Sequence, residues 1–152
     1  KTEESLEEVI SSAVGRFRKR FPEVQVQVCI PESFIMVPMD ATLIEQVINN
    51  LLENAYFHSG SHGPIDLQAS VDGPYVSIAI RDQGNGIRPE LLGTLFDGGG
   101  VSDNQTGDSH KGMGIGLTLC KTIINAHGGH IEASNYDKGA LFTFTLPDWR
   151  EY

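Results

Sequence analysis

The N-terminal segment carries apolar side chains at the spacing of one helix face. Six of them recur every three or four positions: Leu6, Val9, Ile10, Ala13, Val14 and Phe17. This period predicts an amphipathic helix, which Pro22 brings to an end. The pattern then alternates in residues 24–30, which predicts a strand with one buried face, and residues 34–37 predict a second strand.

A longer helical pattern begins after Asp40, whose carboxylate can cap the helix. Its predicted buried face consists of apolar residues: Leu43, Ile44, Val47, Ile48, Leu51, Leu52 and Ala55. The pattern ends in a stretch rich in glycine and histidine at residues 58–64. Residues 65–71 and 75–80 then predict two strands joined by a turn.

The last part of the chain predicts one more helix and two more strands. The helix follows the sequence GMGIGL at residues 112–117 and ends near Gly128 or Gly129, either of which can supply a left-handed cap. Residues 130–136 and 140–147 predict strands around a turn. The order of elements predicts a two-layer α/β sandwich, in which a mixed, mostly antiparallel sheet packs against three helices.

Residues 97–111 lie between these elements and contain a single aliphatic residue, Val101. Such a polar stretch can bury almost nothing, and long loops within compact domains usually have a function. We therefore expect a mobile lid, which a bound ligand partly orders.

The composition narrows the choice of ligand. The 152 residues suit one domain, and the net charge of −9 disfavours nucleic acid as a partner. An acidic protein that holds a nucleotide needs a cation between the two, and Mg²⁺ is the usual one. No apolar run approaches the roughly 20 residues that span a bilayer, and no signal segment is visible, so we expect a cytoplasmic domain without membrane insertion. Cys29 and Cys120 are expected to be buried thiols.

A polar stripe runs along the second predicted helix. Gln46, Asn50 and Asn54 follow at intervals of four and therefore share one side of the helix. Asparagine is a poor helix former, so its repeated use points to a role for the side chains. An amide oxygen is a good ligand for Mg²⁺, although a solvated polar face is the plainer interpretation.

An aspartate stands at the end of a predicted buried strand, followed by two glycines. Asp82 can accept a hydrogen bond from an exocyclic amine, and Gly84 and Gly86 let the backbone lie flat against a planar ring. This arrangement suits adenine. The alternative is an ordinary turn built on the aspartate.

Three more glycines open the third predicted helix. Gly112, Gly114 and Gly116 let backbone N–H groups approach phosphate oxygens at a helix N-terminus. The spacing departs from the dinucleotide fingerprint, and Met113 stands where a Walker A loop needs lysine.

Four segments together resemble a known family. EQVINNLLENA, DQGNGI, GMGIGL and KGALFTFTLP are similar to the N, G1, G2 and G3 boxes of the ATP-binding catalytic domain of sensor histidine kinases, within the GHKL superfamily. The resemblance implies the Bergerat-type ATP-binding fold. The stretch MVPMDATLIEQVINNLLENA and the glycines of DGGG further resemble KdpD-type kinases, which sense potassium or turgor.

The resemblance implies a role for each matching residue. Asn54 corresponds to the Mg²⁺ ligand, Asn50 to the catalytic polar residue one turn earlier, and Asp82 to the carboxylate that recognises adenine. Gly139 corresponds to the glycine of the last box, and Phe96 to the start of the F box. The implied nucleotide site comprises Asn50, Asn54, His58, Asp82, Gly84, Gly86, Ile87, Lys111, Gly112, Met113, Gly114, Ile115, Gly116 and Leu117.

Four positions depart from, or qualify, the pattern. Phe57 stands where the family usually has a lysine that reaches the phosphates, and no second aromatic follows Phe96. His58 either contacts the nucleotide or caps its helix. Asn50 replaces the glutamate that activates water in ATP-hydrolysing relatives, and an amide cannot act as that base, so ATP should be kept for transfer.

The acceptor half of a histidine kinase reaction is not visible in this chain. All five histidines stand in unsuitable contexts: His58, His62, His110, His127 and His130. The pair in HGGH favours a structural role over metal binding. We therefore expect residues 1–22 to be a helix and linker from a missing dimerisation segment, and residues 23–152 to be the ATP-binding catalytic domain.

The expected partners are ATP or ADP, a dimerisation domain that carries the acceptor histidine, and a response regulator. The parent protein would be a bacterial sensor kinase of the inner membrane. Two alternatives stay open. One is a nucleotide-binding docking module that transfers no phosphate, and the other is a freestanding serine kinase of the anti-sigma type.

Overall fold

The computed structural model describes residues 2–31, 35–59, 63–84, 86–87, 89–92, 95–96, 111–136 and 139–148. The lid predicted at residues 97–111 falls outside this part of the chain, except for Lys111. The elements in chain order are β1 (Thr2–Ser5), α1 (Leu6–Arg20), β2 (Val26–Cys29), β3 (Met36–Met39), α2 (Ala41–Ser59), β4 (Ile65–Asp72), β5 (Tyr75–Arg81), α3 (Pro89–Leu92), α4 (Lys111–Ala126), β6 (Ile131–Tyr136) and β7 (Gly139–Pro147).

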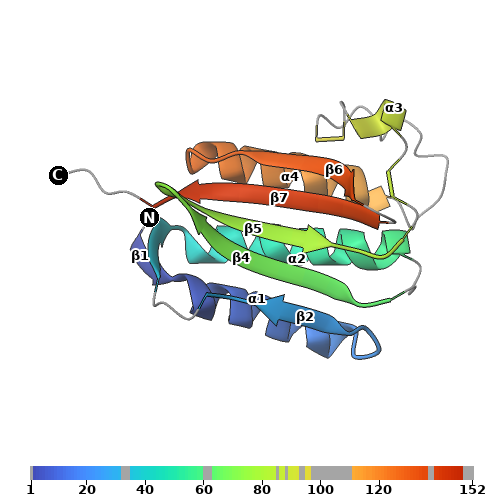
Figure 1. The fold of residues 1–152 in the computed structure, drawn as a ribbon, viewed down its shortest axis with the longest axis horizontal. Coiled ribbons are helices and arrows are strands. Elements are labelled where there is room, and N and C mark those ends of the chain that lie inside the picture. The colour runs from blue at the N-terminus through green and yellow to red at the C-terminus, as the bar shows by residue number, and fades with distance from the viewer. Residues whose placement is uncertain are drawn as a thin grey trace.

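The main sheet has five strands in the order β2-β4-β5-β7-β6. β2 runs parallel to β4, and every other neighbouring pair is antiparallel. The helices α1, α2 and α4 lie side by side on one face of this sheet, with α2 in the middle (Figure 1). The predicted two-layer sandwich of a mixed sheet and three helices is therefore confirmed.

The core lies between the sheet and the helix layer. Alternate residues of β4, β5 and β7 point into it, including Leu67, Ile78 and Phe144. All six apolar residues predicted for the first helix are buried there. Because α1 shares this core with α2, it packs as part of the same unit, and the proposed division after residue 22 stays a prediction.

The C-terminus of α4 is attached to the N-terminus of α2 by His127. Its ring is buried, with Nδ1 donating to the carbonyl of Ile123 (2.8 Å) and Nε2 accepting from the N–H of Asp40 (3.1 Å). Gly128, at φ +80°, ends α4 in the left-handed cap predicted there. The structural role predicted for the HGGH segment is therefore confirmed for His127.

Several local predictions were wrong in detail. β1 was not predicted, because its residues are polar and its only strand partner among the described residues is β3, which lies at residues 36–39 rather than 34–37. Val28 and Cys29 are exposed, since β2 is an edge strand with only one neighbour. Leu43, predicted to be buried, is 37% exposed in the first turn of α2. The predicted cap of that helix is present, since Asp40 Oδ1 accepts from the N–H of Leu43 (3.1 Å).

No helix of the described part is both long and apolar enough to span a bilayer.

Candidate nucleotide site

Asp82 is a buried carboxylate at the end of the central strand β5. The residue is 1% exposed, and Oδ1 accepts hydrogen bonds from the N–H groups of Gly84 (2.9 Å) and Ala140 (3.0 Å). The main-chain N–H of Asp82 in turn donates to the carbonyl of Ala140 (3.0 Å). Two main-chain N–H groups, one of them from the start of β7, therefore hold the carboxylate in place.

The second carboxylate oxygen of Asp82 and the amide of Asn54 have no partner. Asn54 is 5% exposed on α2. Its Oδ1 and Nδ2, together with Asp82 Oδ2, are the buried side-chain nitrogen and oxygen atoms without a hydrogen bond in the described part of the chain. Each such atom costs roughly 1–3 kcal/mol, so folded proteins rarely keep them without a reason. A ligand that binds to these atoms would remove that cost.

The elements that carry these residues end on the same side of the molecule. Figure 1 shows the C-terminal ends of β5 and α2 beside the N-terminal ends of β7 and α4. Asp82 follows β5, and Asn54 lies near the end of α2. The sequence predicted both residues as nucleotide contacts, and the structure buries both with unused polar atoms.

Two glycines near Asp82 are required, one by close approach and one by its backbone conformation. A Cβ built on Gly139 would lie 1.8 Å from the carbonyl oxygen of Asp82, which no side chain could tolerate. Gly86 has φ +82°, in the left-handed region that favours glycine, and a Cβ there would lie 2.7 Å from Asn135 Oδ1. Gly84 is buried and donates to Asp82.

Asn135 contacts the main chain near Asp82, a contact that the sequence did not reveal. From β6 its Oδ1 accepts from the N–H of Ile87 (2.6 Å), and its Nδ2 donates to the carbonyl of Ile87 (2.8 Å). Asparagine is disfavoured in strands, which is the one local signal that could have drawn attention to it.

The polar stripe of α2 divides into three environments. Gln46 is exposed, Asn50 is half-buried and Asn54 is buried. Asn50 faces α4, where a Cβ on Gly116 would lie 3.6 Å from its Cγ.

Asn49, next to this stripe, has a structural role. Its Nδ2 donates to the carbonyls of Ala13 and Glu45 (both 3.3 Å) and so links α1 to α2.

Cys120 of α4 is buried where α4 packs against α2. Burial raises the pKa of its thiol to about 12, and the Asn50 amide lowers that pKa only in part. A thiol with so high a pKa is inert at neutral pH. The expected buried thiol is therefore confirmed at Cys120.

Comparison with known proteins places this site in a family. Residues 39–150 match the sequence model of the histidine kinase-, DNA gyrase B- and HSP90-like ATPases. The chain belongs to this ATPase family. It is 43% identical over 145 residues to the sensor protein KdpD of Clostridium acetobutylicum, a match that covers 95% of this chain and 16% of that protein.

Solved structures of histidine kinases share the fold. The catalytic domain of histidine kinase ThkA matches with a TM-score of 0.81 and 26% identity, over 99% of this chain and 98% of that one. A structure of ThkA in complex with the response regulator protein TrrA matches with a TM-score of 0.78 and 27% identity, over 97% of this chain and 42% of that one. The resemblance to histidine kinase catalytic domains, and to KdpD-type kinases among them, is confirmed.

The glycine-rich segment of this ATPase domain lies within a helix. α4 begins at Lys111, so Gly112, Gly114 and Gly116 occupy its first turns, at the start of a helix as predicted. The prediction that the helix begins only after residue 117 was wrong. Glycine lowers helix stability by about 1 kcal/mol per position but does not forbid the conformation. Leu117 is buried, whereas the side chains of Lys111, Met113, Ile115 and His58 lie outside what the structure describes.

Phe57 stands where the resemblance leads us to expect a lysine. It is 50% exposed, and its ring packs against those of Tyr56 (centroids 5.2 Å apart) and Phe21 (6.0 Å). The ring belongs to an aromatic group at the C-terminal ends of α1 and α2. Phe96 of the F box packs edge-on against Phe142 of β7 (6.2 Å).

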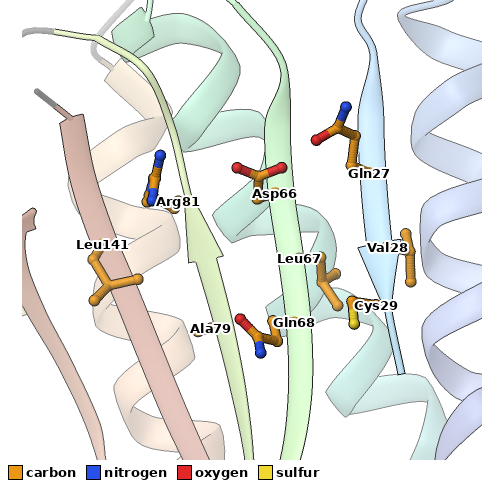
Figure 2. A pocket seen from close by; sticks show the side chains of 9 residues that line it. All are labelled: Gln27, Val28, Cys29, Asp66, Leu67, Gln68, Ala79, Arg81 and Leu141. Carbon is orange, nitrogen blue, oxygen red and sulfur yellow. The ribbon is translucent and has the colours of Figure 1, made fainter. Parts of the chain in front are cut away.

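A hollow of about 460 Å³ lies on the other face of the sheet. Figure 2 shows Gln27, Asp66 and Arg81 in front of the strands, with the helices behind them. These residues are neighbours in the strand register, in one row across β2, β4 and β5. Strand alternation turns Arg81 away from the face to which the buried Ile80 belongs. The hollow is therefore separate from the site at Asn54.

Proposed function

We propose that this domain binds Mg²⁺-ATP and donates the γ-phosphoryl group to a histidine on a separate dimerisation domain. One observation carries the proposal. The buried side-chain atoms without partners in the described structure belong to Asp82 and Asn54, the two residues predicted to contact adenine and Mg²⁺. Membership of the ATPase family and the KdpD relative support it. The chain spans only 16% of that relative, so the reaction of the whole protein is inferred.

Asp82 would select the base. Its Oδ2 can accept a hydrogen bond from the 6-amino group of adenine, while Oδ1 stays bound to Gly84 and Ala140. Guanine presents a carbonyl oxygen in place of this amine, which a carboxylate would repel. ATP should therefore bind much more tightly than GTP.

Asn54 fits the role of a magnesium ligand. Its amide oxygen is buried and unpartnered, and Mg²⁺ is commonly held by few protein ligands together with phosphate oxygens and water. The ion would neutralise phosphate charge on this acidic chain. Asn50, one turn earlier, would orient the phosphates. Since its amide cannot accept a proton from water, it should not promote hydrolysis.

The acceptor histidine is expected on another domain. His127 is unsuitable because it is buried and both ring nitrogens are bonded. We infer that a histidine of the dimerisation domain attacks the γ-phosphate in line, and that this domain contributes positioning and charge neutralisation. A response regulator would receive the phosphate next, which the ThkA complex with TrrA supports by analogy.

The test is calorimetric titration with ATP, with and without Mg²⁺, for the unmodified chain, Asp82→Asn and Asn54→Ala. We expect binding that Asp82→Asn nearly abolishes, and a magnesium dependence that Asn54→Ala removes. Addition of the dimerisation domain of a KdpD relative should then give an acid-labile phosphohistidine. Absence of binding at millimolar ATP would refute the proposal.

A nucleotide-binding module without transfer activity is the second candidate. Phe57 favours it, because an aromatic ring packed on Tyr56 cannot compensate phosphate charge as lysine would. This candidate predicts ATP binding with no phosphate on any histidine domain supplied. An acid-stable product would instead indicate a serine kinase.

A further inference from the structure

Asn135 holds the main chain of Ile87 through both atoms of its amide. Oδ1 accepts from the N–H at 2.6 Å, and Nδ2 donates to the carbonyl at 2.8 Å. Ile87 is buried and lies outside any strand, so its two main-chain groups need partners that a sheet does not supply. The Asn135 side chain supplies both and acts as a substitute for a neighbouring strand.

The position of Asn135 relates this contact to Asp82. Asn135 and Ala140 are directly paired across the β6–β7 hairpin. Ala140 binds Asp82 through its N–H and its carbonyl. One cross-strand pair therefore holds both ends of the segment 82–87, with Asp82 at one end and Ile87 at the other.

The sequence of the segment is adapted to this contact. Gly86, next to Ile87, has φ +82°, and a Cβ there would lie only 2.7 Å from Asn135 Oδ1. The absence of a side chain at Gly86 thus allows the amide to approach. Asn135 is an exposed residue, so what distinguishes the contact is the pairing of both of its amide atoms with the main chain of the buried Ile87.

We infer that Asn135 is a positioning residue for adenine recognition. It keeps the main chain at Ile87 bound to β6, so that Asp82 Oδ2 stays directed at the base. The inference rests on the proposed nucleotide binding. The Asn135 amide hydrogen-bonds the main chain of Ile87, and its role is exerted through that main chain.

The experiment compares Asn135→Ala and Asn135→Asp with a matched control, Asn125→Ala. Asn125 is an exposed asparagine near the end of α4, on a different element. Asn135→Asp preserves the shape and the acceptor for the Ile87 N–H, but replaces the donor with an oxygen that opposes the Ile87 carbonyl. Calorimetry gives the affinities for ATP and GTP, thermal melting gives the stability, and hydrogen exchange without nucleotide follows the Ile87 amide.

We expect Asn135→Ala to weaken ATP binding about tenfold, which corresponds to the loss of two hydrogen bonds that order the segment. GTP binding should not change, so the preference for ATP over GTP falls by the same factor. The Ile87 amide should exchange faster, and Asn135→Asp should behave like Asn135→Ala. Asn125→Ala should match the unmodified chain in every measurement.

Two results would overturn the inference. One is an unchanged ATP affinity in Asn135→Ala, and the other is an equal loss of ATP and GTP affinity, which would indicate a purely structural role. Failure of the proposed function is recognised separately, since the unmodified chain would then bind neither nucleotide. In that case the positioning role fails as well, even when faster exchange at Ile87 shows that the contact exists.

Discussion

Gly139 and Asp82 lie in direct main-chain contact, so close that a Cβ on Gly139 would be 1.8 Å from the Asp82 carbonyl oxygen and 2.7 Å from its Oδ1. The first residue of β7 must therefore be glycine for the carboxylate to reach its position at the end of β5. The glycine that this contact requires therefore lies beside the carboxylate that we expect to recognise adenine.

Gly139→Ala should displace Asp82 and abolish ATP binding, because the added methyl group meets main-chain atoms that cannot rotate away. Overpacking of this kind costs about 1–3 kcal/mol or more, which thermal melting will show. Gly15→Ala is the matched control. It lies in α1 with nothing within 4 Å of its Cβ, and should stabilise the protein by about 0.5–1 kcal/mol. Normal ATP affinity in Gly139→Ala would contradict the assigned site.

Asp82→Asn should separate function from stability. The unmodified residue buries a carboxylate with an unpartnered oxygen, so removal of its charge should leave the melting temperature of the nucleotide-free protein equal or higher. ATP affinity should fall at least about 100-fold, since an amide nitrogen replaces the acceptor of the adenine amine. Asp66→Asn, on the opposite sheet face, should change neither quantity. A strongly destabilised Asp82→Asn that still binds ATP would make Asp82 a structural residue.

Much of the fold could be predicted because burial imposes a regular period on the sequence. β5 and β7 each turn alternate residues into the core, and their alternating apolar residues revealed them. The long apolar face of α2 did the same for a helix. β1 left no such signal, since its residues are polar and pair with β3, and a pairing between distant segments has no local period.

The site was predictable only where residue type and local context point to the same chemistry. Asp82 after a strand, followed by glycines, is such a case, and its burial agrees with the prediction. Asn135 is not, because its contact with Ile87 joins residues 48 positions apart through a side chain and the main chain. The start of α4 was placed too late, because the glycines lowered the apparent helix propensity more than they constrain the backbone.

Cys120 should make the stability depend on pH in alkaline solution. Its thiol has a pKa of about 12 in the folded protein against 9.0 as the ordinary value, chiefly because of burial. Below pH 9 the thiol is protonated in both states. Between pH 9 and about 12 only the unfolded chain loses the proton, so the free energy of unfolding should fall by about 1.4 kcal/mol per pH unit.

Denaturant titrations from pH 8 to 10.5 can measure this slope. Cys120→Ala is the control, because it keeps all other titrating groups, including Cys29. Its free energy of unfolding should fall less steeply as the pH rises. Ellman's reagent should modify the exposed Cys29 in the native protein and Cys120 only after unfolding. Equal slopes in the two proteins would show that the thiol ionises as readily in the folded state as in the unfolded state.

Phe57→Lys should improve nucleotide binding at a small cost in stability. The family usually has lysine at this position to meet the phosphates, whereas Phe57 is half-exposed and packs its ring on Phe21 and Tyr56. Loss of these ring contacts should cost about 0.5–1.5 kcal/mol each at most. The added charge should raise ATP affinity about fivefold at low ionic strength, and the gain should shrink as salt is added.

Phe57→Gln is the control, because it removes the ring without adding charge. In the same calorimetric titration it separates the effect of losing the ring contacts from the effect of the added charge. If Phe57→Lys and Phe57→Gln bind ATP equally, the side chain at this position does not reach the phosphates, and their charge must be met by other residues of the site.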